Sequence, residues 1–141
     1  MRIRTVTADD IEAVVALWRD VFPEYNDPAR PQRDPRTNIV RKLAFGDGLF
    51  WLADEGGAVV GTVMAGYDGH RGWLYSLGVL PAHRGRGVGR RLVAHAEAAL
   101  AARGCPKINL QVLIANESAR AFWRVLGYAP DAVESLGRRL T

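Results

Sequence analysis

The most informative segment of this chain is Leu77-Gly-Val-Leu-Pro-Ala-His-Arg-Gly-Arg-Gly-Val-Gly-Arg-Arg-Leu92, in which an apolar run passes into a turn rich in glycine and arginine. The pattern predicts a strand, a turn and the start of a helix, in that order. Glycines at 85, 87 and 89 allow positive φ and a close approach of the backbone to a ligand. The first helical turn offers N–H groups without intrahelical partners, and the neighbouring arginines add positive charge. The segment therefore predicts a pyrophosphate-binding loop.

Two common phosphate-binding motifs do not fit this loop. A dinucleotide-binding fingerprint would need a glycine where the chain has Arg90, and a P-loop would need a Gly-Lys-Ser/Thr sequence that the chain lacks. A solvated glycine-rich turn that binds nothing is the alternative interpretation. The order strand, turn, helix and a second motif downstream favour the binding loop.

The composition indicates one globular domain covering residues 1–141. Hydrophobic residues make up 48% of the chain and charged residues 24%, which is the usual balance for such a domain. The single cysteine, Cys105, has no partner for an internal disulfide, and the N-terminal residues lack an apolar signal segment. These features predict a cytoplasmic protein.

Several classes of partner are not expected. The formal net charge is +4, but the arginines concentrate around residues 84–91 without a nucleic-acid-binding motif, so the charge favours one small polyanion. No apolar run approaches the ~18 residues needed to cross a bilayer, so no membrane partner is expected. No histidine or carboxylate pair has ligand spacing, so no metal is expected.

Hydrophobic periodicity and turn residues divide the chain into strands and helices. We expect strands at 2–6, 49–54, 58–67, 73–80, 107–113, 128–133 and 135–140, and helices at 11–22, 37–45, 88–103 and 117–126. The fold class is therefore α/β, of the α+β kind, with a mixed, mostly antiparallel sheet of about seven strands and about four helices. Exposed edge strands near the C-terminus would allow a homodimer.

Gly78 interrupts the strand expected at 73–80. A glycine inside a strand often marks a bulge or a point where another backbone or a ligand approaches closely. We expect both features here.

The glycine turn and a downstream segment together resemble a known family. Arg84-x-x-Gly87-x-Gly89 is similar to the pyrophosphate-binding signature of the GNAT family of acetyl-coenzyme A-dependent N-acetyltransferases. Asn116-x-x-Ala119-x-x-Phe122-Trp123-x-x-Leu126-Gly127-Tyr128 is similar to the second motif of the family. The order of the expected elements also matches, so the resemblance covers nearly the whole chain. Residues 66–72 and 102–107 resemble a subgroup of small bacterial acetyltransferases with an unassigned substrate.

The resemblance implies a GNAT fold whose sheet is splayed between the fourth and fifth strands. It implies acetyl-coenzyme A as the cosubstrate, with the diphosphate on the N–H groups of residues 84–89 and the pantetheine beside the fourth strand. The coenzyme-binding residues that it implies are Leu77, Gly78, Val79, Arg84, Gly85, Arg86, Gly87, Val88, Gly89, Asn116, Phe122 and Trp123.

The reaction implied by the resemblance is direct attack of a primary amine on the thioester carbonyl. The acceptor would be a small metabolite or a polypeptide. The developing negative charge on the carbonyl oxygen needs a fixed N–H donor, for which the backbone of residues 77–79 is the candidate. Tyr75 alternates with Leu77 along the strand and is the candidate catalytic residue, as a proton donor or relay. Glu24 and Tyr25 are the candidate acceptor-binding residues.

The chain departs from the family pattern at two positions. Trp123 stands where many members have the tyrosine that protonates the thiolate, and an indole N–H is not a usable acid near neutral pH. Gln111 stands where some relatives have a glutamate, and an amide cannot act as a base. A non-catalytic coenzyme A-binding sensor or regulatory module is therefore the alternative function. An enzyme with another acyl donor or acceptor also stays open.

Overall fold

A computed structural model describes all 141 residues, which form two compact units, Met1–Leu110 and Gln111–Thr141. The first unit contains a five-stranded sheet in the order β1-β2-β3-β4-β5. Strands β1 to β4 are antiparallel, and β5 runs parallel to β4. The strands are β1 (Arg2–Thr5), β2 (Phe50–Glu55), β3 (Ala58–Tyr67), β4 (Gly72–Val79) and β5 (Ile108–Asn109).

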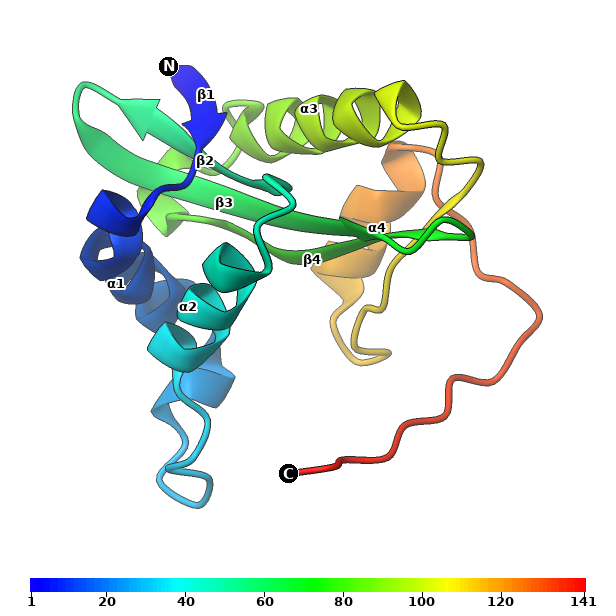
Figure 1. Cartoon of the computed structure of the whole chain (residues 1–141), viewed down its shortest axis with the longest axis horizontal. Helices are drawn as coiled ribbons and strands as arrows, with labels where there is room; N and C mark the ends of the chain where they lie inside the picture. Colours follow the sequence, from blue (N-terminus) through cyan, green and yellow to red (C-terminus); the bar gives the residue numbers. More distant parts are fainter. The chain divides into compact units, whose positions relative to one another are not determined.

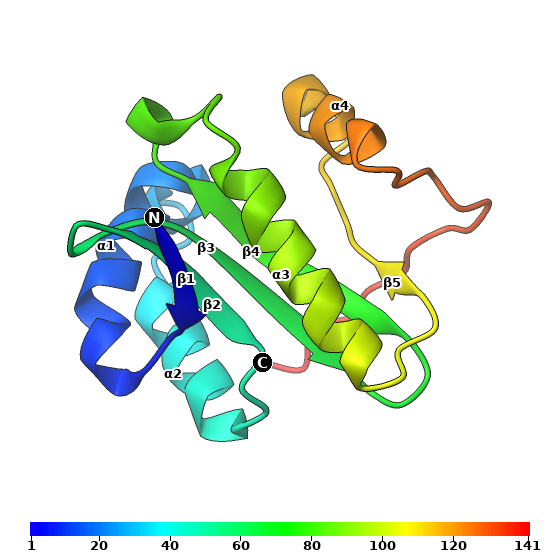
Figure 2. The same ribbon diagram turned by 90° about the horizontal axis from the view of Figure 1, so that it is seen from above.

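Helices cover both faces of this sheet (Figures 1 and 2). Helices α1 (Ile11–Val21) and α2 (Pro35–Phe45) lie on one face, and α3 (Val88–Ala102) lies on the other. Short 3-10 segments, Ala8–Asp10, Pro23–Asn26 and Pro81–His83, connect the elements. None of the helices has the length and apolar character that crossing a bilayer requires.

The core follows from the two side-chain periodicities. Alternate residues of β2 face opposite layers: Phe50 and Leu52 pack with Trp18 of α1, whereas Trp51 contacts the ring of His95 on α3. Residues spaced four apart share one face of α3, and this face is buried: Val88, Leu92, Ala96 and Leu100 are each at most 5% exposed. Trp18 is fully buried.

A buried carboxylate joins β1 to the start of α1. Asp10 accepts bonds of 2.8 and 2.9 Å from the guanidinium of Arg4 and one of 2.8 Å from the backbone N–H of Thr7. These donors favour the charged carboxylate, and the Arg4 hydrogen bonds above all hold the pKa of Asp10 down to about 2. The capping box formed by Thr7 and Asp10 is thus extended into an ion pair with Arg4.

The fold class is as predicted, but the sheet has five strands and not about seven. Residues 128–133 and 135–140 are not strands, and the second unit contains one helix, α4 (Glu117–Val125). A strand needs a neighbouring backbone to satisfy its N–H and C=O groups, and Pro130 has no N–H to contribute. The C-terminal edge strands, on which the expectation of a homodimer rested, are therefore absent.

The parting of the fourth and fifth strands is confirmed within the first unit. The β4–β5 ladder consists of Gly72 paired with Ile108 and Trp73 paired with Asn109. Beyond Trp73, β4 has no strand partner on its β5 side. The strand expected at 107–113 is accordingly reduced to two residues.

Candidate functional site

The predicted binding loop joins β4 to α3. Gly85 and Gly87 have φ of 76° and 80°, and a Cβ at either position would meet no atom within 4 Å. Gly87 is the N-cap of α3, and no side chain caps the helix there. The first backbone bond of α3 runs from the N–H of Arg91 to the C=O of Gly87, so the N–H groups of residues 88–90 face the helix N-terminus without intrahelical partners.

Contacts within the first unit hold this loop in place. The side chain of Arg84 donates from Nε to the carbonyl of Val79 at 3.2 Å, and His83 Nε2 lies 3.1 Å from a Glu55 carboxylate oxygen. The helix also sits close to the sheet, because a Cβ on Gly61 would lie 3.3 Å from a methyl of Val88. Contacts within the protein therefore support the shape of the loop.

The loop fits a diphosphate. Its backbone N–H groups and the helix dipole attract an anion, and the left-handed glycines leave the approach free of side chains. Arg86 and Arg90 are exposed beside it and add positive charge. Gly85 and Gly87 have the positive φ that the sequence predicted, whereas Gly89 lies within α3 and is not among the glycines with positive φ. The binding of a coenzyme by Arg84, Arg86, Val88 and these glycines stays a prediction.

β4 contains a bulge just before Gly78. Thr62 of β3 pairs with Gly78 and Met64 pairs with Tyr75, so that two β4 residues, Ser76 and Leu77, lie opposite Val63 alone. Ser76 has φ of 51°, and no other residue apart from glycines has a positive φ. Because an L-residue in this conformation costs about 1–2 kcal/mol, the surrounding structure must stabilise it.

A buried hydrogen-bond chain supports this bulge. The indole N–H of Trp18 donates to the hydroxyl of Thr62 at 2.9 Å, and that hydroxyl donates to the carbonyl of Ser76 at 3.1 Å. Trp18 and Thr62 are both fully buried. Sequence reasoning missed this chain, although a threonine within an apolar strand and an indole N–H on a buried helix face each signal a polar partner.

Gly78 lies where α1 meets β4. A Cβ at this position would be 2.7 Å from a methyl carbon of Val21 and 2.9 Å from the ring of Phe22. A close approach is present, but side chains at the C-terminal end of α1 make it, and not another backbone or a ligand as expected. The expected bulge is confirmed, centred on Ser76 and Leu77.

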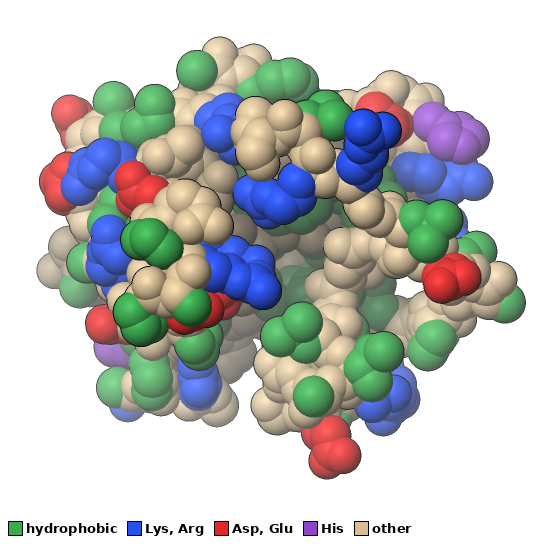
Figure 3. Space-filling view, turned by 90° about the horizontal axis from the view of Figure 1, so that it is seen from below, with side chains coloured by type: hydrophobic (Ala, Val, Ile, Leu, Met, Phe, Trp, Pro, Cys, Tyr) green, Lys and Arg blue, Asp and Glu red, His purple; other side chains and the backbone are tan.

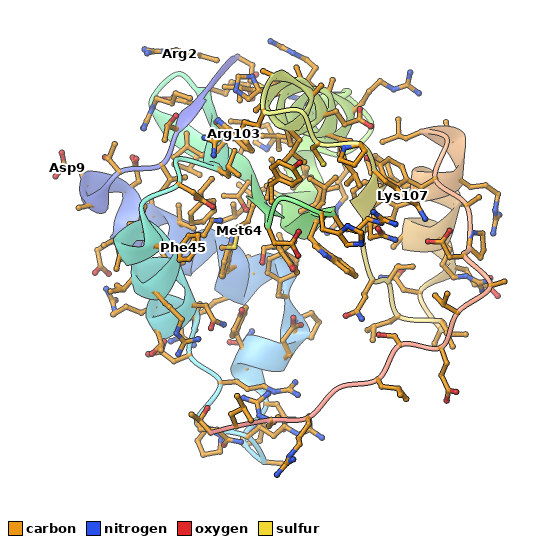
Figure 4. All side chains as sticks on the ribbon, turned by 45° about the vertical axis from the view of Figure 1, so that its right-hand side comes forward. Arg2, Asp9, Phe45, Met64, Arg103 and Lys107 are labelled. Carbon is orange, nitrogen blue, oxygen red and sulfur yellow. The ribbon has the colours of Figure 1, made fainter.

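Tyr75 lies on the same sheet face as α1 and α2. Its ring stacks on Trp73 with centroids 6.4 Å apart, and its cross-strand neighbour Met64 lies on the α2 side of the sheet (Figure 4). The side chain is 49% exposed. Partial burial, reinforced by the negative charge of Asp68, raises the pKa of Tyr75, so the phenol keeps its proton at neutral pH and can donate it.

The two predicted acceptor-binding residues differ in their surroundings. Glu24 is exposed on the 3-10 segment after α1. The ring of Tyr25 stacks on Trp18 with centroids 5.8 Å apart, and its hydroxyl accepts a 3.0 Å bond from the amide of Asn38 on α2. Tyr25 therefore anchors this segment to both helices, and its pKa is raised, mainly by burial.

The second unit carries the remaining predicted residues. Asn116 is the N-cap of α4, with its side-chain oxygen accepting from the N–H of Ala119 at 3.1 Å. The ring of Trp123 makes edge contacts with Phe122 and Tyr128, with both pairs of centroids 5.1 Å apart. Gln111 donates from its amide to the hydroxyl of Ser135. The structure gathers no three or more His, Cys, Asp or Glu side chains in a group that could hold a metal.

Comparisons with known proteins identify the family of this chain. The model of the acetyltransferase (GNAT) family matches residues 11–128. A protein named acetyltransferase from Sodalis glossinidius is 46% identical over 141 residues, covering 99% of this chain and 96% of its own. A solved GCN5-related N-acetyltransferase from Ralstonia eutropha is 28% identical with a TM-score of 0.75, covering 97% of each chain.

The PaiA N-acetyltransferase of Thermoplasma acidophilum, solved in complex with coenzyme A, shares the fold. Its TM-score is 0.83 at 16% identity, over 94% of this chain and 92% of that one. The family model and the close relative cover the glycine loop, the bulged strand and α4 alike. The chain therefore belongs to the GNAT family of N-acetyltransferases.

Proposed function

We propose that this enzyme transfers an acetyl group from acetyl-coenzyme A directly to a primary amine of a small metabolite or a polypeptide. The observation that carries the proposal is the uncapped N-terminus of α3 behind two open, left-handed glycines. Such a loop is complementary to a diphosphate, and the diphosphate of the coenzyme is remote from the reacting thioester. Because the family match crosses from one unit into the other, we also propose that residues 1–141 act as one domain. We propose the cytoplasm, expected from the sequence, as the location of this domain.

In this proposal the nucleotide half of the coenzyme binds to residues 84–89, and the pantetheine lies along β4 at Leu77, Gly78 and Val79. The open side of β4 supports the second part, because an amide-bearing arm can bond to a strand edge that lacks a partner. From the family motif, Asn116, Phe122 and Trp123 are proposed to contact the coenzyme as well. Asn116 would do so in addition to its role as a helix cap.

The proposed reaction is a direct transfer in which few groups of the protein take part. The amine nitrogen bonds to the thioester carbon, the carbon–sulfur bond breaks, the amine loses a proton and the sulfur gains one. A backbone N–H of residues 77–79 stabilises the charge that develops on the carbonyl oxygen. Tyr75, protonated at neutral pH, is the proposed proton donor to the sulfur. Glu24 is proposed to bind the ammonium group of the acceptor, and Tyr25 is proposed to contact the acceptor beside it.

The acceptor class stays broad. Solved proteins that share the fold include an aminoglycoside 6′-N-acetyltransferase and a ribosomal-protein-S18-alanine N-acetyltransferase, so the fold accommodates both small and polypeptide amines. Over α1 and α2, Lys and Arg side chains lie beside Asp and Glu side chains (Figure 3). This mixture of charges favours a discrete acceptor over a long phosphate backbone.

Calorimetric titration with coenzyme A, followed by a thiol-release assay with acetyl-coenzyme A and a panel of amines, tests the proposal. We expect saturable binding and amine-dependent release of free thiol. Binding without thiol release above background would favour the sensor alternative. The absence of any heat on titration would overturn the assignment of the loop.

A further inference from the structure

We propose that Trp18 and Thr62 are positioning residues that aim the backbone N–H of Leu77 at the coenzyme. The inference rests on the proposed function. It concerns the bulge in β4 and the buried chain that runs from α1 through β3 to Ser76. None of these side chains belongs to the glycine loop.

The direction of the hydrogen-bond chain is determined by its first member. An indole N–H can only donate, so the Thr62 hydroxyl must accept from Trp18. Its single hydrogen is then directed to the carbonyl of Ser76. With both side chains fully buried, no water competes for these groups. The Ser76 carbonyl is thereby held toward β3 and α1.

The carbonyl of Ser76 and the N–H of Leu77 belong to one peptide group. The chain has no cis peptide bonds, so the two groups point in opposite directions. With the carbonyl directed at Thr62, the Leu77 N–H is directed away from β3. That is the side on which β4 has no strand partner beyond Trp73. A ligand amide or a carbonyl oxygen placed there would meet this donor.

The left-handed conformation of Ser76 makes the support necessary. A single residue with φ of 51° turns the peptide out of the regular strand pattern, and such a conformation persists only when its surroundings impose it. Without the Thr62 hydroxyl, the Ser76 carbonyl would lose its buried donor. The peptide would then be free to rotate toward ordinary strand geometry, and the Leu77 N–H would turn with it.

The test uses three variants of the full chain. Thr62→Val removes the hydroxyl, Thr62→Ser retains it, and Val14→Ala weakens the same core cluster while leaving the Trp18 indole and the Thr62 hydroxyl in place. Each is titrated calorimetrically with acetyl-coenzyme A and with 3′-phospho-ADP, the nucleotide half alone. Amide spectra from ¹H–¹⁵N NMR follow Leu77 in the free proteins.

We expect Thr62→Val to weaken acetyl-coenzyme A binding about 10-fold, the usual effect of one lost hydrogen bond, with 3′-phospho-ADP binding unchanged. Thr62→Ser restores the affinity, and Val14→Ala keeps it. The Leu77 amide resonance moves in Thr62→Val alone. If Thr62→Val lost affinity equally for acetyl-coenzyme A and 3′-phospho-ADP, or if its Leu77 resonance did not move, the positioning role would be overturned.

Two further outcomes are distinguishable. If the wild-type protein bound neither ligand, the proposed function would fail. The Leu77 resonance would still decide whether the hydrogen bonds of Trp18 and Thr62 position the peptide group between Ser76 and Leu77. If Thr62→Val did not fold, Trp18→Phe would replace it, because that variant removes the donor and leaves the hydroxyl free to turn away from Ser76. An unchanged Leu77 resonance in Trp18→Phe would then overturn the inference.

Discussion

Glycine has two roles in the binding loop: it adopts the left-handed backbone conformation, and it leaves the N–H groups open to a ligand. Replacing Gly87 by alanine separates these two roles. Gly87 has φ of 80° and Gly104, just beyond the other end of α3, has φ of 82°. Neither position has an atom within 4 Å of the added Cβ. The same backbone penalty of about 1–2 kcal/mol therefore applies to Gly87→Ala and Gly104→Ala, and both should lower Tm by roughly 3–8 °C.

The two variants should differ in coenzyme affinity. Backbone strain is present in the free and the bound protein, so it largely cancels from the binding free energy. At Gly87, however, the added methyl stands at the helix N-terminus, where a diphosphate must approach the N–H groups. Losing one charge-assisted hydrogen bond at about 1.5–3 kcal/mol corresponds to a loss of roughly 10- to 100-fold in affinity.

Calorimetric titration with coenzyme A and thermal melts of both variants measure these quantities. Gly104→Ala should bind like the wild type, since the 15-residue helix keeps it about 22 Å from the loop. The reasoning is refuted if Gly87→Ala keeps its affinity within about threefold, or if Gly104→Ala loses as much, because a single hydrogen bond is worth more than that difference.

Three other perturbations have defined outcomes. Tyr75→Phe should lower kcat for acetyl transfer roughly 10- to 100-fold and leave coenzyme affinity unchanged, and an unaltered kcat in the thiol-release assay would exclude the phenol as proton donor. Asp10 has a pKa of about 2 when folded and 3.8 as a free group, so its ion pair with Arg4 stabilises the protein fully above about pH 5, and this contribution is lost as the pH falls from about 5 to about 1. In urea unfolding, Asp10→Asn should remove about 1–2 kcal/mol at pH 6 and clearly less at pH 2, and an equal loss at both pH values would contradict this. Gly78→Ala should destabilise the protein by about 1–3 kcal/mol through its contact with Val21, and adding Val21→Ala should cost less than the sum of the single changes. If the two destabilisations simply added, the added methyl at position 78 would not be in contact with Val21.

Much of the site could be predicted because it is local. The glycine loop and the start of α3 occupy adjacent residues, and backbone sterics decide their conformation wherever the chain is placed. The buried stripe of α3 follows from its periodicity in the same way. The observed φ of Gly85 and Gly87 and the burial of Val88 agree with the prediction of a glycine turn followed by an amphipathic helix.

Other expectations failed because they depended on distant partners. Strands are expected at 128–133 and 135–140, yet no strand forms there, and Leu136 and Leu140 are exposed. The strand expected at 107–113 pairs with β4 over two residues only. A pattern with period two shows that a segment is suited to a sheet, but only a neighbouring strand can satisfy its backbone.

The sequence by itself determined the amphipathic helices, the antiparallel hairpin of β2 and β3 and the anion-binding turn, since each is specified by side-chain periodicity or glycine stereochemistry within a few residues. Only the tertiary structure decided the conformation of Ser76. Its left-handed backbone is stabilised by Thr62, and Thr62 is oriented by Trp18, which lies 44 residues earlier in the chain. Hydrogen bonds across that separation exist only after α1 and β3 have packed, so no local pattern encodes them.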